Sequence, residues 1–330
     1  MIVRRVAAAL VLVAAVAASA GCGASSEDVA PNTSATLLLD APPNAVHAGI
    51  YTTTARGYDE ALGVNLRIRT PTATTDAPKL LASGRVQLAI LDIHDLAIAR
   101  ERGLDLVGVM AIVQQPLAAL FLAPSIATAR ELQGRSVGVS GRPSDDAALN
   151  TIVASAGGDP SQVLRTPLGS DPVRGLLDGS VAAAIGSWSV DAVALRHARP
   201  GLRELRLGDH GAPPFPELVL ATARATLRDE AGVVRGAVQA LARGYAEVLS
   251  DPDSAGASMP ASGLGRASVV RRLEAVAPAF TAGARVFGEL DGGRLRAWAR
   301  WERGVGIVRR LPDVERAFDG RYVPRSGSRD

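Results

Sequence analysis

The feature that most constrains the fold is a regular alternation of short apolar runs with longer segments of helical pattern, which starts at Thr36. Each run has the length and the turn-forming flanks of a β-strand, whereas segments such as 47–62 and 93–103 have the length of helices. Strands that alternate with helices form mostly parallel sheets covered on both faces, so we predict an α/β fold. The predicted strands are 36–40, 65–69, 86–91, 106–112, 117–123, 136–140, 162–168, 181–186, 202–207 and 217–223.

The grouping of these strands predicts two α/β lobes. Apolar runs near 119–124 and 216–222 are placed to carry the chain from the first lobe to the second and back. We therefore assign residues 36–123 and 218–330 to lobe 1 and residues 124–217 to lobe 2. Ligands of such folds bind in the crevice at the carboxyl ends of strands, so residues just after strands are the candidates for a binding site.

Residues 1–21 have the pattern of a secretory signal peptide. Arg4 and Arg5 precede the apolar stretch 6–20, which is too short and too rich in alanine to span a bilayer. The stretch ends in small residues directly before a cysteine, Cys22. We therefore predict that the protein is exported.

Cys22 is the only cysteine, so it has no partner for an internal disulfide. Its surroundings resemble a bacterial lipobox, which implies lipidation of Cys22 and a lipid anchor at the extracytoplasmic face of the cell membrane. An ordinary cleavage site beside a stray cysteine is the alternative. Residues 22–35 are predicted to form a polar tether.

The net charge excludes a dedicated nucleic-acid-binding protein. The chain has 36 basic and 33 acidic side chains, and two of the arginines lie in residues 1–21. Without those two, 34 basic side chains stand against 33 acidic ones, a net charge of +1. A nearly balanced surface supplies no field that would follow a phosphate backbone.

The common enzyme motifs are missing from the sequence. It contains no complete G-x-x-x-x-G-K-[ST], G-x-G-x-x-G or G-x-S-x-G. The histidines are not paired at metal-ligand spacing, and no cysteine besides Cys22 is available for zinc or iron–sulfur ligation. Lys79 is the single lysine and hence the one candidate for Schiff-base chemistry. We expect no enzyme, no cofactor and no metal site.

One segment carries a resemblance to a known family. LLLDAPPNAVHAGIYTTTARGY (37–58) resembles the opening of the NMT1/THI5-like group of solute-binding proteins, with the approximate pattern L-D-W-x-P-N-x-x-H-x-G-x-Y-x-A-x-x-x-G-Y. The positions in register are Asp40, Pro43, Asn44, His47, Gly49, Tyr51, Gly57 and Tyr58. Segments 81–90, 106–116, 131–139 and 216–222 match later landmarks, so the resemblance covers roughly residues 36–250.

The resemblance implies a type II periplasmic-binding-protein fold, whose two lobes are joined by two crossover segments and close on a small solute by a hinge motion. It implies partners in the permease and ATPase subunits of an ABC importer. We expect a monomeric substrate-binding lipoprotein that captures a small heteroaromatic solute, similar to a pyrimidine precursor of thiamine, in the cleft between the lobes. Riboflavin, sulfonates or other organic anions are the alternative solutes. A pyrimidine-processing enzyme that uses Lys79 and a receptor-like lipoprotein are the alternative classes.

Two departures from the family pattern matter. Ala41 replaces an aromatic residue, so a stacking face for a flat ring has to come from elsewhere. The cysteine-rich motif of the eukaryotic pyrimidine synthases of the group is absent, which argues against synthesis of the pyrimidine.

Four candidate ligand-binding residues lie in the first lobe. Asp40 ends the first predicted strand, where its carboxylate can accept hydrogen bonds from an amino group. Asn44 offers a donor and an acceptor, and His47 can hydrogen-bond or stack at the start of the first helix. Tyr51 follows four residues later on the same helix face. Each also has a structural interpretation, as a turn, capping or core residue.

Four further candidates belong to the second lobe and the return crossover. Ser144 and Asp145 open a helix whose first-turn amides can grip a polar ligand edge, although both are also ordinary helix caps. Trp188 can replace the stacking face lost at Ala41, or can simply pack. Glu217 needs a partner, either a ligand amine or an arginine. Together with Asp40, its carboxylate argues against an anionic solute.

Overall fold

The computed structural model describes residues 33–169, 171–260 and 266–324. The predicted signal peptide 1–21 and the predicted lipidation of Cys22 lie outside these residues. The predicted tether also lies outside them, except for residues 33–35, which belong to a strand instead.

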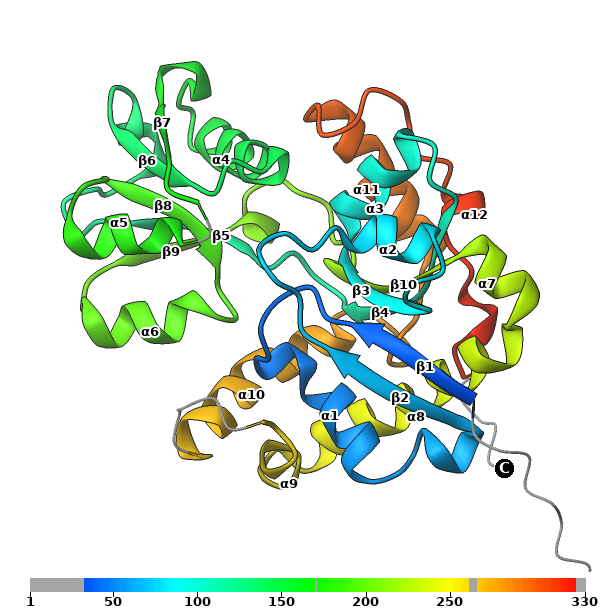
Figure 1. The fold of residues 1–330 in the computed structure, drawn as a ribbon. Coiled ribbons are helices and arrows are strands. Elements are labelled where there is room, and N and C mark those ends of the chain that lie inside the picture. The colour runs from blue at the N-terminus through cyan, green and yellow to red at the C-terminus, as the bar shows by residue number, and fades with distance from the viewer. Residues whose placement is uncertain (1–32, 170, 261–265, 325–330) are drawn as a thin grey trace, which may run out of the picture. The chain divides into compact units, whose positions relative to one another are not determined.

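The first sheet has five strands in the order β2-β1-β3-β10-β4 (Figure 1). β1 is parallel to β2 and β3, whereas β10 is antiparallel to its neighbours β3 and β4. β1 starts at Thr33 because Val64 and the residues after it in β2 offer a partner to every residue of β1. The strands are β1 Thr33–Leu38, β2 Val64–Arg69, β3 Leu88–Asp92, β4 Leu106–Val113 and β10 Leu218–Ala223.

The second sheet also has five strands, in the order β7-β6-β8-β5-β9. β6 is parallel to β7 and β8, and β5 is antiparallel to β8 and β9. Each sheet therefore contains one antiparallel strand, and the mostly parallel α/β architecture predicted from the sequence is confirmed. The strands are β5 Ala118–Leu122, β6 Ser136–Val139, β7 Leu164–Pro167, β8 Ala183–Ser187 and β9 Arg203–Arg206.

The chain passes between the two sheets twice. β5 pairs within the second sheet, so the first connection runs through residues 114–117, ahead of the predicted lobe boundary at residue 123. The return runs through residues 207–217, between β9 and β10. The assignment of whole lobes, helices included, stays a prediction.

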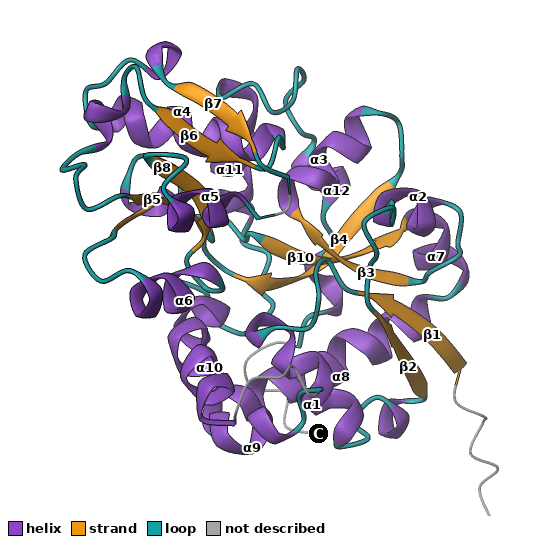
Figure 2. Cartoon of the chain, turned by 60° about the vertical axis from the view of Figure 1, so that its left-hand side comes forward, coloured by secondary structure: helices purple, strands orange, loops and turns teal. Residues whose placement is uncertain are grey.

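Alternation along β1 divides the core of the first sheet between its two faces. Leu37 packs in one apolar cluster with Ile50 of α1 and Leu241 of α8, whereas Leu38 packs in another with Leu81 of α2 and Leu96 of α3. Figures 1 and 2 show helices on both faces of this sheet. Such two-sided burial is typical of sheets with parallel strands.

The helices of the described residues begin, in several cases, at an aspartate whose carboxylate accepts a first-turn amide, as at Asp76, Asp171 and Asp291. None of these helices combines the length and the apolar character needed to cross a membrane. They are α1 Ala48–Ala55, α2 Ala77–Ala82, α3 Ile93–Glu101, α4 Pro143–Ser155, α5 Pro172–Asp178, α6 Asp191–Ala198, α7 Arg224–Asp229, α8 Ala231–Ser250, α9 Pro252–Ala257, α10 Arg266–Thr281, α11 Gly292–Gly304 and α12 Val314–Ala317.

Helices α1 and α8 approach each other so closely that two glycines are required at their contact. A Cβ on Gly244 would lie 2.1 Å from Thr53 Oγ1, and one on Gly49 would lie 2.3 Å from the ring of Tyr245. The Tyr245 hydroxyl donates to the carbonyl of Val46 over 2.8 Å. This contact fixes the start of α1, which is next to the predicted site.

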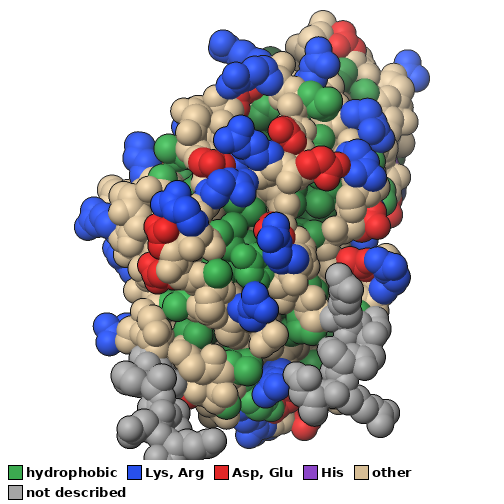
Figure 3. All heavy atoms as spheres, turned by 90° about the vertical axis from the view of Figure 1, so that its right-hand side faces the viewer, with side chains coloured by type: hydrophobic (Ala, Val, Ile, Leu, Met, Phe, Trp, Pro, Cys, Tyr) green, Lys and Arg blue, Asp and Glu red, His purple; other side chains and the backbone are tan. Residues whose placement is uncertain are grey.

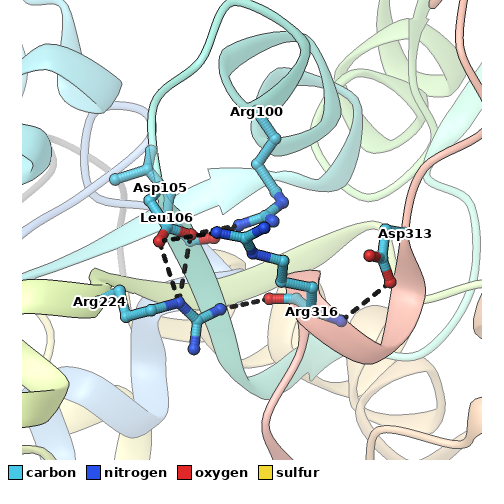
Figure 4. A network of polar contacts seen from close by, with 6 residues as sticks. All are labelled: Arg100, Asp105, Leu106, Arg224, Asp313 and Arg316. Carbon is cyan, nitrogen blue, oxygen red and sulfur yellow. Dashed lines mark hydrogen bonds and ion pairs between the residues drawn. The ribbon is translucent and has the colours of Figure 1, made fainter.

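A polar network joins elements at one edge of the first sheet (Figure 4). Arg100 and Arg224 both donate to the carboxylate of Asp105, over 3.2 and 3.1 Å. Arg100 also donates to the carbonyl of Leu106, and Arg224 donates to the carbonyl of Arg316. The network thereby ties α3, α7 and α12 to the start of β4.

Charged side chains are mixed on the surface. On the face seen in Figure 3, Lys and Arg side chains are interspersed with Asp and Glu rather than gathered in one patch. This distribution agrees with the nearly balanced charge of the chain.

Candidate functional site

A cavity of about 1000 Å³ lies between the facing edges of the two sheets. Its walls come from the segments that follow β1, β3, β6 and β8 and from those that precede β5 and β10. It therefore occupies the crevice at the strand ends where the sequence predicted a binding site. Its polar lining includes Asp40, Asn44, Asp92, His94, Asp95, Arg142, Ser144, Asp145, Ser187, Asp191 and Glu217.

Asp40 is held in place by a buried histidine. His47 is fully buried, and its Nε2 lies 2.8 Å from Asp40 Oδ1. The backbone N–H of Asn44 donates to His47 Nδ1 over 3.2 Å, so this network assigns the ring proton to Nε2, which donates to Asp40. The carboxylate is 25% exposed and lines the cavity, which leaves Oδ2 as an acceptor for a solute.

Both the backbone N–H and the side chain of Asn44 form hydrogen bonds that hold this turn. Its Oδ1 accepts from the N–H of Val46 over 2.9 Å, as the N-cap of the 3₁₀ turn Ala45–His47. Asn44 lines the cavity, whereas His47 lies behind Asp40 and Tyr51 lies outside the lining. The structure thus brings Asp40 and Asn44 to the cavity and leaves His47 as a positioning residue.

Of the three candidates in the part of the chain that forms the second sheet, two line the cavity and one does not. Ser144 and Asp145 line the cavity at the start of α4, and Asp145 Oδ2 accepts from the Ser140 N–H and hydroxyl over 2.5 Å each. Trp188 is 4% exposed and lies outside the lining. Its Nε1 donates to the carbonyl of Pro116 over 2.9 Å, and the Arg206 guanidinium lies 4.3 Å from its ring centre. Trp188 therefore packs, and its ring gives the cavity no stacking face.

Glu217 lines the cavity directly before β10 and is 8% exposed. Burial and the neighbouring charge of Asp92 raise the pKa of the Glu217 carboxyl to about 7. Its Oε2 is buried with no hydrogen-bond partner among the described residues. A buried carboxylate oxygen without a partner is costly, so this position is poised for a ligand.

An ionic cluster around Glu217 was missed by the sequence reasoning. Asp92 ends β3 and Asp95 lies in the first turn of α3. Arg142, which precedes α4 in the part of the chain that forms the second sheet, reaches across to both of them. Its Nη2 lies 3.3 Å from Asp92 Oδ2 and 2.6 Å from Asp95 Oδ2. These carboxylates hold the pKa of Arg142 above its ordinary value. The guanidinium therefore links the two sheets across the cavity.

His94 belongs to the same cluster. Its Nδ1 lies 2.6 Å from Glu302 Oε2 of α11, and the rings of Phe215 and Trp301 lie 5.4 and 5.8 Å from its imidazole. Burial lowers the pKa of His94, but the carboxylates of Asp92 and Glu302 outweigh it and raise that pKa to about 10. A sequence signal existed, since Asp92, His94 and Asp95 directly follow the strand predicted at 86–91.

The cavity as a whole is acidic. Seven carboxyl groups line it against four cationic side chains, Lys79, Arg102, Arg142 and protonated His94. Such a lining attracts cations and hydrogen-bond donors and repels anions. The lining contains no Tyr, Trp or Phe among the described residues, so a flat ring would lie against aliphatic walls, which include Leu39, Leu117, Ile185 and Leu207.

The sequence matches a known family over most of its length. The family described as NMT1/THI5 like matches residues 44–255. The formylaminopyrimidine-binding protein of Halalkalibacterium halodurans is 32% identical over 222 residues, which are 66% of this chain and 67% of that protein.

Relatives with other roles are more distant. Riboflavin-binding protein RibY of Chloroflexus aurantiacus is 25% identical over 306 residues, 88% of this chain and 86% of that protein. The 4-amino-5-hydroxymethyl-2-methylpyrimidine phosphate synthase THI5 of Saccharomyces cerevisiae is 25% identical over 231 residues, 66% of this chain and 67% of that protein.

Solved structures show the fold. The periplasmic aliphatic sulphonate binding protein SsuA of Escherichia coli superposes with a TM-score of 0.70 at 16% identity, covering 87% of this chain and 92% of that one. The chain thus has the type II periplasmic-binding-protein fold that the family resemblance implied.

Proposed function

Because the chain belongs to the NMT1/THI5-like family, we propose that it is a solute-binding protein that captures a small aminated heteroaromatic compound in the cavity between its sheets. The class we favour is the aminopyrimidines that are precursors of thiamine, since a relative 32% identical is a formylaminopyrimidine-binding protein. The observation that carries the proposal is the acidic lining, in which the carboxylate of Asp40 is held ready by buried His47.

The chemistry of an aminopyrimidine suits this lining. Its amino group donates hydrogen bonds, and a carboxylate such as Asp40 only accepts them. Asn44 can complement a ring nitrogen and its neighbouring N–H, because its amide has both a donor and an acceptor. The aliphatic walls then contact the faces of the ring. Hydrogen bonds to a charged acceptor are stronger than those between neutral groups, which supports Asp40 as the main polar contact.

The state of Lys79 favours a carrier over an enzyme. Its side chain is 77% exposed at the cavity lining, and its Nζ lies 2.7 Å from Asp76 Oδ2. A lysine that forms Schiff bases is normally desolvated or placed beside another cation, so that its amine is neutral. Lys79 has neither environment.

The volume and the charge of the cavity also bear on two other classes of solute. A volume of about 1000 Å³ has room for a larger ring system, and the relative RibY is a riboflavin-binding protein, so a flavin is the second candidate. A sulfonate would meet seven carboxyl groups against four cations, which disfavours it.

Export and delivery complete the proposal. Residues 1–21 would direct export, lipidated Cys22 would hold the chain at the extracytoplasmic face of the cell membrane, and the monomer would hand its solute to the permease of an ABC importer. The signal pattern, the lipobox resemblance and the fold support this part of the proposal.

Thermal unfolding of the purified chain with a panel of solutes tests the proposal. The panel contains aminopyrimidines, thiamine, riboflavin, taurine and alkanesulfonates. A solute at a hundredfold excess over its Kd should add about 2.7 kcal/mol to the free energy of unfolding, which raises the midpoint measurably. A shift with aminopyrimidines alone is the expected result. A shift with sulfonates alone would contradict the electrostatic reasoning, and a shift with riboflavin alone would favour the second candidate.

A further inference from the structure

Three side chains that line the cavity have the chemistry of metal ligands. Asp92, His94 and Glu217 each present one carboxylate oxygen or ring nitrogen, and these three atoms lie within 4.8 Å of one another. Asp92 and His94 flank the start of α3, and Glu217 arrives from the return connection before β10. The sequence predicted no metal site because the third ligand is supplied only by the fold.

A second observation points to a missing partner. Glu217, which belongs to this cluster, is 92% buried, and its Oε2 has no hydrogen-bond partner among the described residues. Its backbone carbonyl accepts from the N–H of Ile93 over 2.9 Å, which fixes the position of the residue. An oriented, buried acceptor without a donor is what a bound cation would satisfy.

The orientation of His94 fits the same conclusion. Glu302 Oε2 lies 2.6 Å from His94 Nδ1, so Nε2 is the ring nitrogen left for an ion, which would displace the proton from it on binding. Histidines that bind metals commonly donate their other ring N–H to a carboxylate, which fixes the ring and increases its basicity. Glu302, which is fully buried, would have this role.

We propose that Asp92, His94 and Glu217 bind a first-row divalent cation such as Zn²⁺ at the wall of the cavity. One imidazole and two carboxylates form a mixed nitrogen and oxygen set, which suits Zn²⁺ or Mn²⁺ better than Ca²⁺ or Mg²⁺. Two ligands of one tetrahedral Zn²⁺ at bonds of about 2.1 Å are separated by about 3.4 Å. Because the three atoms lie within 4.8 Å of one another, ion binding would draw the most widely spaced pair together by up to about 1.4 Å.

Charge supports a dication at this position. Four carboxyl groups, those of Asp92, Asp95, Glu217 and Glu302, surround His94, and Arg142 is the one arginine or lysine that pairs with them among the described residues. Arg142 lies closer to Asp95, at 2.6 Å, than to Asp92, at 3.3 Å. It can therefore stay on Asp95 while Asp92 binds the ion.

The test is a calorimetric titration of the metal-stripped full chain with Zn²⁺, with no solute present. One Zn²⁺ per chain should bind, Glu217→Gln should weaken it at least tenfold, and Glu302→Gln should weaken it by about 10- to 100-fold. Arg142→Gln should tighten binding, since it removes the competing cation. The control is His210→Gln. His210 does not line the cavity, and its ring contacts the Ser155 hydroxyl instead of the cluster, so its loss should leave Zn²⁺ binding unchanged.

Co²⁺ gives a second readout that does not depend on affinity. Bound at this site, it should show visible absorption that changes in the Asp92→Asn chain and is unaltered in the control. Absence of saturable one-to-one Zn²⁺ binding, or equal affinity in the wild type and Glu217→Gln, would overturn the proposal. Because the titration contains no solute, either result leaves the solute-binding function to its own test.

Discussion

Replacing Glu217 by glutamine should make the protein more stable at alkaline pH. Glu217 is buried, and burial together with the charge of Asp92 raises the pKa of its carboxyl from 4.5 to about 7. The folded state therefore prefers the protonated form. Glutamine has the same shape and is always neutral, so Glu217→Gln removes the ionisation while keeping the packing.

The sign and size follow from proton linkage. Below pH 4.5 both states of the wild type are protonated, and between pH 4.5 and about 7 the unfolded chain loses the proton first. The free energy of unfolding then falls as pH rises, by about 1.4 kcal/mol for each unit of the pKa difference. Between pH 5 and pH 8 the advantage of Glu217→Gln should widen by about 2–3 kcal/mol.

Urea unfolding at pH 5, 6, 7 and 8, followed by tryptophan fluorescence with a chelator present, measures this difference. Glu247→Gln is the matched control, because Arg56 and Tyr58 hold the pKa of Glu247 below its usual range. Its substitution should lower the free energy of unfolding at neutral pH. A difference between wild type and Glu217→Gln that stays constant or narrows as pH rises would refute the reasoning.

Three further predictions concern the helix contact and the cavity. Gly244→Ala should lower the free energy of unfolding, measured with urea, by about 1–3 kcal/mol or more, because its Cβ would lie 2.1 Å from Thr53 Oγ1. Gly232→Ala is the control in the same helix: its Cβ would meet nothing within 4 Å, so it should raise the free energy of unfolding by roughly 0.5–1 kcal/mol. Asp40→Asn should weaken aminopyrimidine binding about tenfold or more in calorimetry, and an unchanged Kd would remove Asp40 from the site. Lys79→Ala should leave that Kd within about twofold, and a complete loss of binding would favour lysine chemistry instead.

The strands were predictable because each carries its own burial signal. β4 is buried at all eight residues and reads as a continuous apolar run, and every predicted strand overlaps one in the structure. The apolar run 117–123, by contrast, fits either sheet by its sequence alone. Only its pairing with β8 and β9 assigns it to the second.

The site was predictable where polar residues stand near the ends of strands. Five of the predicted residues line the cavity, namely Asp40, Asn44, Ser144, Asp145 and Glu217. The Trp188 side chain was not predictable in this way. Its indole N–H donates to the carbonyl of Pro116, which is 72 residues away in the sequence, and this contact fixes the orientation of the ring. The contact between His94 and Glu302 spans 208 residues and depends on how α11 packs, which no local pattern reports.

The exposed side chain of Lys79 has a practical consequence. It is the only lysine in a chain whose other cations are arginines, and guanidinium groups do not react with amine-selective reagents near neutral pH. Apart from the amino terminus, such a reagent would therefore place a single fluorophore on the protein, on the lining of the cavity. A dye at that position would change its emission when a molecule enters. The arginine-rich composition thus offers an optical sensor for the protein's own ligand without any engineered attachment point.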